Sequence, residues 1–218
     1  MKSLHMQETH HHNNVITPSV QKKWNQIYSL EPVMGGTPQP AQVLVDFSYL
    51  LPQTGRALDL ACGKGGNALF LAESGLETWA WDISDVVLDQ LSTCAKQTGL
   101  SVHAEVRDVE CQPLPTACFN VIVVSRFLNR SICQQIIEML APGGLLFYQT
   151  FTIDALTMEI GPRNPDYLLK RNELLKLFDR MQLCGYREDG LIKTQKNNMH
   201  AQAYLVAQKI YPLGDDND

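Results

Sequence analysis

Between residues 56 and 151 the chain alternates short apolar runs with stretches of helical periodicity. The run FNVIVV at 119–124 is apolar at nearly every position, which is typical of a strand buried on both faces. The stretches between such runs repeat apolar residues at helical spacing. This alternation predicts an α/β fold in which helices cover both faces of a mostly parallel sheet.

The predicted elements follow one another without an internal repeat. Each apolar run is bounded by turn residues, and each helical stretch lies between two runs. We predict strands over 56–61, 77–81, 101–106, 119–124 and 144–151, and helices over 65–74, 84–98 and 130–140.

The C-terminal part adds a helix over 171–184 and two strand-like runs near 186–194 and 200–209. The turn Lys196-Asn197-Asn198 lies between these two runs, and a short turn permits only an antiparallel pair. We therefore predict that the sheet has seven strands and ends in an antiparallel hairpin, within a three-layer αβα arrangement.

A length of 218 residues fits a single α/β domain. We predict a disordered tail over 1–17, a domain over 18–211 and an acidic tail over 212–218. Within the domain, residues 18–52 carry two helical stretches separated by a Pro- and Gly-rich connection, and we interpret them as a lid. Simple packing of an amphipathic helix is the alternative.

Charge and hydropathy limit the partners that we expect. Lys and Arg total 18 against 23 for Asp and Glu, so the net charge is −5 and gives no general attraction to nucleic acid or to an anionic membrane. No apolar run approaches the roughly 20 residues that span a bilayer, and the N-terminus is polar where a secretory signal is apolar. We predict a cytoplasmic protein that binds neither nucleic acid nor membrane. We also expect no metal site, because the histidines at 10–12 read as a terminal tract.

The most informative segment is DLACGKGGN at 59–67, between a predicted strand and a predicted helix. Glycines in such a turn let the backbone approach a ligand closely, at the sheet edge where open α/β folds bind ligands. The next strand ends at Asp82, 23 residues after Asp59, where a carboxylate can accept both hydroxyls of a ribose. Alternatively, Asp82 caps the following helix together with Ser84. The turn and the acid together predict a nucleoside-containing cofactor.

Two features favour S-adenosylmethionine over a dinucleotide. The turn lacks the full G-x-G-x-x-G spacing, since Ala68 stands three residues after Gly65. Asp59 lies four residues before Gly63, where its carboxylate would repel a pyrophosphate but attract a ligand that carries an ammonium and a sulfonium.

Five segments carry a resemblance to the class I S-adenosylmethionine-dependent methyltransferases. They are DLACGKGGNALFLA, WDIS, RDVECQPLP, FNVIVVSRFLNR and LAPGGLLFYQTF, within residues 57–151. The later FYQTF, GPRNPDYLL and NELL motifs resemble small bacterial methyltransferases of the tellurite- or thiopurine-resistance type. The resemblance implies a Rossmann-like fold and transfer of a methyl group from S-adenosylmethionine.

The resemblance also implies roles for single residues. Asp59, Gly63 and Gly65 would line the methionine moiety, and Asp82 would hold the ribose. Asp108 would accept from the adenine amino group, although a turn-forming Asp is the alternative. The expected cofactor-binding residues are Asp59, Ala61, Gly63, Gly65, Asn67, Asp82, Ile83, Asp108, Val109, Ser125 and Arg126.

Methyl transfer from a sulfonium is an in-line displacement that mainly requires alignment and exclusion of water. The sequence shows no convincing general base, so the catalytic residues stay unassigned. We expect a small-molecule acceptor near Tyr28, Arg126 and Arg163, where the arginines would bind an anion or form surface ion pairs. The alternatives are a protein or tRNA methyltransferase, a non-catalytic S-adenosylmethionine-binding protein, and a nicotinamide-dependent oxidoreductase.

Overall fold

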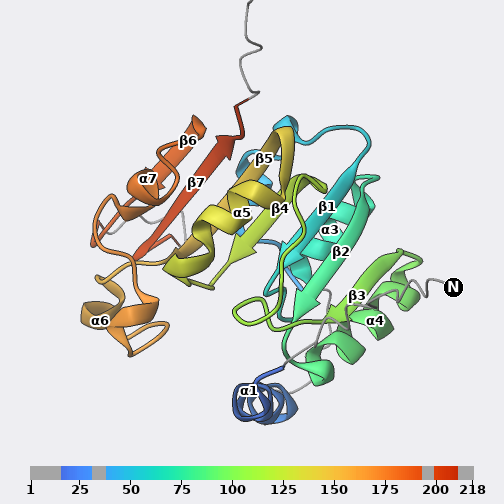
Figure 1. Ribbon diagram of the computed structural model, residues 1–218. Coiled ribbons are helices and arrows are strands. Elements are labelled where there is room, and N and C mark those ends of the chain that lie inside the picture. The colour runs from blue at the N-terminus through green and yellow to red at the C-terminus, as the bar shows by residue number, and fades with distance from the viewer. Residues whose placement is uncertain (1–15, 31–37, 193–198, 211–218) are drawn as a thin grey trace, which may run out of the picture.

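The computed structural model describes residues 16–30, 38–192 and 199–210. Its seven strands form one sheet in the order β3-β2-β1-β4-β5-β7-β6 (Figure 1). The strands are β1 (Arg56–Leu60), β2 (Glu77–Asp82), β3 (Val102–Val106), β4 (Phe119–Ser125), β5 (Leu140–Phe151), β6 (Gln182–Glu188) and β7 (Gln202–Gln208). The helices are α1 (Pro18–Leu30), α2 (Gln42–Asp46), α3 (Gly66–Glu73), α4 (Asp85–Thr98), α5 (Cys133–Met139), α6 (Ala155–Met158) and α7 (Glu173–Leu177), with short 3₁₀ turns η1 (Ser48–Leu50), η2 (Arg130–Ile132) and η3 (Pro165–Tyr167).

The sheet confirms the predicted fold class. Strands β1 to β5 are parallel, whereas β7 runs antiparallel to both β5 and β6. The strand order reverses between β1 and β4, because β2 and β3 extend from one side of β1 while β4 and β5 extend from the other. The carboxyl ends of β1 and β4 therefore border the position at which open α/β sheets bind ligands.

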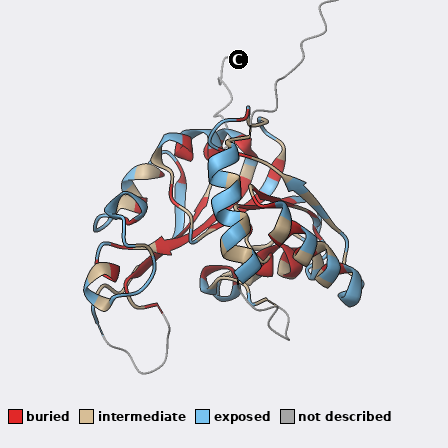
Figure 2. Cartoon of the chain, turned by 90° about the horizontal axis from the view of Figure 1, so that it is seen from below, coloured by how far each residue is buried: buried red, intermediate tan, exposed pale blue. Residues whose placement is uncertain are grey.

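Apolar side chains cover both faces of the central strands. On one face, Leu58 and Ile122 belong to a cluster that includes residues of α5 and α7. On the other, Ala57 and Val123 pack with residues of α2 and α3. Figure 2 shows the buried residues concentrated in the strands, with exposed residues on the outer helix surfaces. Burial on both faces explains why these strands read as continuous apolar runs.

Two helix predictions are wrong in extent. The predicted helix over 171–184 is only α7, because the chain enters β6 at Gln182 and pairs there with β7. The second of the two helical stretches predicted within 18–52, over 41–51, divides into α2 and η1. The predicted turn at Lys196-Asn197-Asn198 lies outside the described residues. Among the described helices, none combines the length and apolar character that crossing a membrane requires.

Candidate functional site

The glycine turn between β1 and α3 has a left-handed backbone at three residues. The φ angles are 54° at Ala61, 52° at Gly63 and 77° at Gly65. Glycine adopts such angles without strain, whereas alanine does not. The Gly63 amide donates to Oδ2 of Asp82 at 2.9 Å, which ties the turn to the end of β2. The turn thus brings together the residues of β1 and β2 that are expected to bind the cofactor.

Gly65 is required for packing as well as for backbone geometry. A Cβ atom there would lie 2.3 Å from a methyl carbon of Leu91, and Leu91 itself is buried. We expect Gly65→Ala to lower the free energy of unfolding by about 2–4 kcal/mol, measured by urea titration. Gly99→Ala is the matched control, because Gly99 also has a positive φ (71°) but a Cβ there would meet nothing within 4 Å. Equal losses in the two variants would show that contact with Leu91 is unimportant.

Asp59 lies in the protein interior, one residue before the carboxyl end of β1. Its side chain is fully buried, and its two carboxylate oxygens accept from Asn67 Nδ2 and from the Ala68 amide, each at 3.1 Å. Burial raises the pKa of Asp59 to about 8, although both hydrogen bonds favour the charged form and oppose this shift. Asp59 is therefore a carboxyl group whose ionisation a nearby cation would strongly favour.

Asp82 lies at the end of β2 and is nearly buried. Its Oδ1 accepts from the Ser84 amide at 2.9 Å, and its Oδ2 accepts from Gly63. Burial raises the pKa of Asp82, against the effect of these hydrogen bonds. The N-cap of α4 is Ser84, whose hydroxyl accepts from the Val87 amide. Because each carboxylate oxygen has a further lone pair, Asp82 retains the capacity to accept two hydroxyl groups.

Asp108 follows β3 and takes part in a turn. Its Oδ1 accepts from the Glu110 amide at 3.2 Å, and its Oδ2 accepts from the Thr17 amide at 3.0 Å. Burial opposes ionisation, but the hydrogen bonds outweigh it and lower the pKa of Asp108. Asp108 therefore does form a turn, and it also anchors the N-terminal segment. Thr17 lies at the end of the stretch predicted to be a disordered tail, but in the structure its amide is hydrogen-bonded to Asp108.

Helix α1 lies across these acidic residues. Besides the Thr17 contact, Asn25 accepts from the Ser84 hydroxyl and donates to Asp85 Oδ1, both at 2.6 Å. The Tyr28 hydroxyl lies 3.1 Å from the position of a Cβ on Gly63. No residue of α1 is buried. The helix thus spans the ends of β1, β2 and β3 through these polar contacts, and Tyr28 also packs against the apolar cluster formed by residues of β2, α3 and α4.

The remaining expected cofactor residues lie around this edge. Ile83 and Ala61 are half-buried, and Val109 is buried in the core cluster beside β4. At the end of β4, Ser125 accepts from Asn67 Nδ2 at 3.0 Å. Arg126 follows with an exposed side chain and a φ of 55°. A left-handed conformation outside glycine is uncommon and often marks a functional position.

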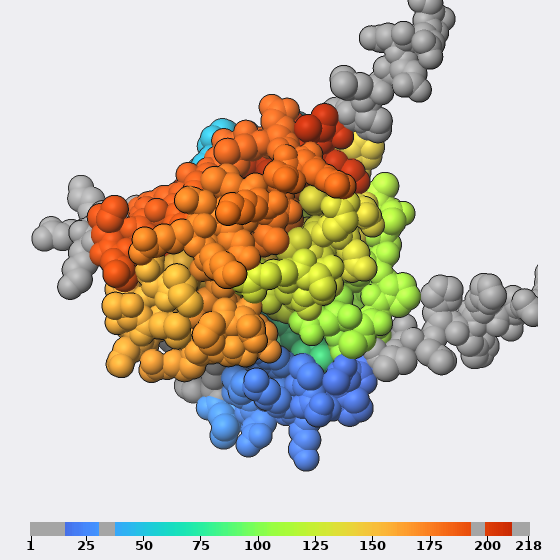
Figure 3. Space-filling model, turned by 60° about the vertical axis from the view of Figure 1, so that its left-hand side comes forward, coloured from blue at the N-terminus to red at the C-terminus, as the bar shows by residue number. Residues whose placement is uncertain are grey.

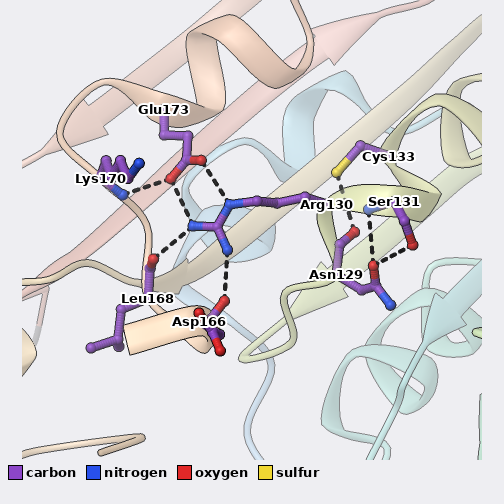
Figure 4. A network of polar contacts seen from close by, with 8 residues as sticks. All are labelled: Asn129, Arg130, Ser131, Cys133, Asp166, Leu168, Lys170 and Glu173. Atoms are coloured by element: carbon purple, nitrogen blue, oxygen red, sulfur yellow. Dashed lines mark hydrogen bonds and ion pairs between the residues drawn. The ribbon is translucent and has the colours of Figure 1, made fainter. Parts of the chain in front are cut away.

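The segment after β5 is held against the end of β4 by Arg130. The Arg130 guanidinium contacts both carboxylate oxygens of Glu173 at 2.7 and 2.9 Å and donates to the carbonyls of Asp166 and Leu168 (Figure 4). Arg130 therefore supports the segment that carries the exposed Arg163. In Figure 3 a hollow separates the blue surface of α1 from the yellow and orange surfaces of these segments.

We expect Arg130→Ala to lower the free energy of unfolding by about 2 kcal/mol, because it removes charge-assisted hydrogen bonds to Glu173 and to two carbonyls. Thermal denaturation would measure this. Arg163→Ala is the control, since the Arg163 side chain is exposed and forms no hydrogen bond or ion pair with the described residues. This variant should change stability by less than about 0.5 kcal/mol. A loss in Arg130→Ala no larger than in the control would contradict the assignment.

Several contacts of the site had no signal in the sequence. Thr17 and Asp108 are 91 residues apart, and Asn67 and Ser125 are 58 apart. Asn25 and Glu173 also join the site only through the fold. Among the described residues, no group of three or more His, Cys, Asp or Glu side chains could hold a metal ion.

A family model described as a methyltransferase domain matches residues 57–144. This span runs from the second residue of β1 to the end of β4 and beyond, and it includes the glycine turn, Asp82 and Asp108. Residues 57–144 therefore form a methyltransferase domain of the class I S-adenosylmethionine-dependent type. Members of this family use S-adenosylmethionine as the methyl donor.

Curated proteins that are similar to this chain are named for different acceptors. The malonyl-[acyl-carrier protein] O-methyltransferase of Enterobacter lignolyticus (strain SCF1) is 29% identical over 46% of this chain and 41% of its own length. The tRNA 5-carboxymethoxyuridine methyltransferase of Escherichia coli (strain K12) is 28% identical over 49% of this chain and 44% of its own. The probable S-adenosyl-L-methionine-dependent methyltransferase TehB of Haemophilus influenzae (strain 10810) is 25% identical over 71% of this chain and 57% of its own length. The matches thus cover between 41% and 57% of these relatives.

Solved structures share the fold at low identity. The crystal structure of TehB from Haemophilus influenzae has a TM-score of 0.63 at 21% identity, over 85% of this chain and 67% of that chain. The [4+2]-cyclase SpnF has a TM-score of 0.68 at 17% identity, over 90% of this chain and 97% of its own. A fold shared with an enzyme named as a cyclase means that the reaction must be argued from the site.

Proposed function

We propose that this methyltransferase transfers the methyl group of S-adenosylmethionine to a small anionic acceptor by in-line displacement. The observation that carries the proposal is the position of Asp59, Asp82 and Asp108. They lie at or just after the carboxyl ends of three adjacent parallel strands, beside a turn with two left-handed glycines. This arrangement supports binding of a ligand with hydroxyl, amino and cationic groups.

The residues present fit S-adenosylmethionine. Asp82 can accept from the ribose hydroxyls with its spare lone pairs. Ile83 and Asp108 lie next to it, where an adenine would need an apolar contact and an acceptor for its amino group. The buried Asp59 would act on the ammonium and sulfonium through its charge, since its side chain has no exposed surface. Bound S-adenosylmethionine supplies an activated methyl group with a neutral leaving group.

The protein's own contribution to transfer would be alignment and exclusion of water. Ser125 ends β4 and Arg126 follows it, so both border the edge of the sheet near which Asp59 lies in β1. Neither is a general base at neutral pH, and the proposal assigns none. An acceptor that is already ionised, such as a carboxylate, needs no base. This favours an anionic nucleophile.

Two arginines support an anionic acceptor. The side chains of Arg126 and Arg163 are exposed and form no hydrogen bond or ion pair with other described side chains, while Arg130 is engaged by Glu173. The names of two relatives also specify acceptors with a carboxyl group, malonyl in one and carboxymethoxyuridine in the other. An arginine can bind a carboxylate through two parallel hydrogen bonds.

The test is transfer of radiolabelled methyl from S-adenosylmethionine to a panel of small carboxylates, thiols and amines. We expect a carboxylate to accept the label, and Arg126→Gln to raise the KM for that acceptor by roughly tenfold or more with the Kd for S-adenosylmethionine unchanged. Labelling of amines alone, or an unchanged KM in Arg126→Gln, would contradict an anionic acceptor held by Arg126.

A tRNA acceptor is the second candidate, because a relative from Escherichia coli is named for one. The net charge of −5 opposes it by giving no general attraction to a phosphate backbone. Adding total tRNA to the same assay distinguishes the two. If tRNA becomes labelled and nuclease treatment removes the label, a tRNA acceptor would replace the small-molecule acceptor that we propose. Binding of S-adenosylmethionine without transfer to tRNA, protein or any small acceptor would support a non-catalytic role.

We also propose that α1 is a lid on the cofactor. None of its residues is buried, and its contacts with the site are a few hydrogen bonds and the packing of the partly buried Tyr28, so opening should cost little. We expect Asn25→Ala to increase the dissociation rate of S-adenosylhomocysteine several-fold in stopped-flow measurements, because two hydrogen bonds to α4 and its cap are lost. Gln26→Ala, at an exposed position of the same helix, should leave the rate unchanged. Equal rates in both variants would contradict the lid.

A further inference from the structure

Asn67 uses all of its hydrogen-bonding groups inside the protein. Its Nδ2 donates to Asp59 Oδ1 at 3.1 Å and to Ser125 Oγ at 3.0 Å, and its Oδ1 accepts from the Ala41 amide at 2.8 Å. The side chain is 4% exposed. It was expected to contact the cofactor, but its polar atoms are already bonded to the ends of β1 and β4 and to the residue before α2.

The partners of Asn67 fix the orientation of its amide. The Ala41 amide can only donate, and an ionised Asp59 carboxylate can only accept. Rotating the amide by half a turn would therefore place a donor against a donor and an oxygen against a carboxylate. Asparagine is suited to this position because it offers one acceptor and two donors from a short, rigid group.

The segment that enters α2 depends on the same side chain. Ala41 is the N-cap of α2, and its own side chain makes no capping bond. Side chains of α3 and β5 supply the partners: Asn67 binds the Ala41 amide, and Gln149 binds the Val43 amide at 2.8 Å. A Cβ on Gly66 would lie 2.2 Å from the Gln39 carbonyl oxygen, so this segment packs directly on the first turn of α3.

We propose that Asn67 is a positioning residue that fixes the Asp59 carboxylate relative to the Ser125 hydroxyl and makes this arrangement depend on docking of the segment before α2. The inference rests on the proposed function, since Asp59 matters here as the negative charge that meets the cationic end of S-adenosylmethionine. A donor on Asp59 holds its oxygens in place and favours the ionised form. The residue thus acts on the cofactor through Asp59 and Ser125.

The test compares two ligands that differ by one charge. S-adenosylmethionine carries a sulfonium and S-adenosylhomocysteine carries a neutral sulfur, so the ratio of their Kd values reports the charge at Asp59. We expect Asn67→Leu to raise the ratio Kd(S-adenosylmethionine)/Kd(S-adenosylhomocysteine) by roughly tenfold relative to wild type, measured by calorimetry. Asn67→Ser, which is smaller and still polar, should shift the ratio in the same direction if Asn67→Leu does not fold.

Gln149→Met is the matched control. It replaces another buried amide that binds an α2 backbone amide, but the side chain of Gln149 hydrogen-bonds to Val43 and Gln202 and not to Asp59 or Ser125. A purely structural role for Asn67 would weaken both ligands equally and leave the ratio within about twofold of wild type, as we expect for Gln149→Met.

Hydrogen exchange tests the link to α2. Binding of S-adenosylmethionine should slow exchange of the Ala41 amide in wild type and have no such effect in Asn67→Leu. A folded Asn67→Leu or Asn67→Ser variant with an unchanged ratio would overturn this inference alone. A folded wild-type protein that binds neither ligand would overturn the proposed function and this inference with it.

Discussion

Asp82→Ala is expected to weaken binding of S-adenosylmethionine and S-adenosylhomocysteine by roughly 10- to 100-fold, because hydrogen bonds from hydroxyls to a charged acceptor contribute about 1.5–3 kcal/mol. Both ligands carry the ribose that we assign to Asp82, so both should weaken equally. The carboxylate is nearly buried at the end of β2 and already orders the Gly63 amide. Calorimetry on the purified protein would measure both Kd values.

The control for this prediction is Asp89→Ala. Asp89 is an exposed carboxylate on α4, so its removal changes the net charge equally without touching the site. We expect wild-type Kd values for this variant. If the Kd values of Asp82→Ala lie within twofold of those of Asp89→Ala, Asp82 does not bind the ligand and serves only as an acceptor for the backbone amides of Gly63 and Ser84.

The second large effect is expected at Asp59 and depends on pH. The pKa of Asp59 is about 8 in the folded protein, against an ordinary value of 3.8, mainly because of burial. Between these values the folded chain holds a proton that the unfolded chain has lost, so the free energy of unfolding should fall as pH rises, by up to about 1.4 kcal/mol per unit. Asp59→Asn cannot ionise and should flatten this dependence between pH 5 and about pH 8 in denaturation experiments.

Ligand binding should show the opposite dependence. A cationic ligand favours the ionised carboxyl, so wild-type affinity for S-adenosylmethionine should rise as pH increases from 6 toward about 8, with release of a proton. Calorimetry in buffers of different ionisation enthalpy would count that proton. Asp59→Asn should bind S-adenosylmethionine more weakly at pH 8, with no proton release. A wild-type affinity that is independent of pH would contradict a buried acid that meets the cationic end of the ligand.

The central fold could be predicted because its elements are determined locally and are buried on both faces. Strands β1 and β4 read as apolar runs, and their carboxyl ends place Asp59 and Ser125 by simple succession along the chain. The segment over 171–184 could not be assigned this way. Leu174, Leu175 and Phe178 suit a helix, but Gln182 onward forms a strand because β7 offers an edge to pair with.

In the candidate site, too, some features could be predicted from the local sequence and others could not. The glycine turn and the three acids stand next to strand ends, and they could be identified by position. The contacts made by Asn67 and the pair of Arg130 with Glu173 join residues that are distant in sequence and carry no local pattern. Such polar pairs depend on which elements the completed sheet brings together.

The most direct test is calorimetric titration of the wild-type protein with S-adenosylmethionine, S-adenosylhomocysteine and NAD. We expect saturable binding of both sulfur ligands at one site and no binding of NAD. The ligands should also stabilise the fold, by about 2.7 kcal/mol at a concentration 100 times the Kd. Binding of NAD in preference to S-adenosylmethionine, or a folded protein that binds neither sulfur ligand, would contradict the account.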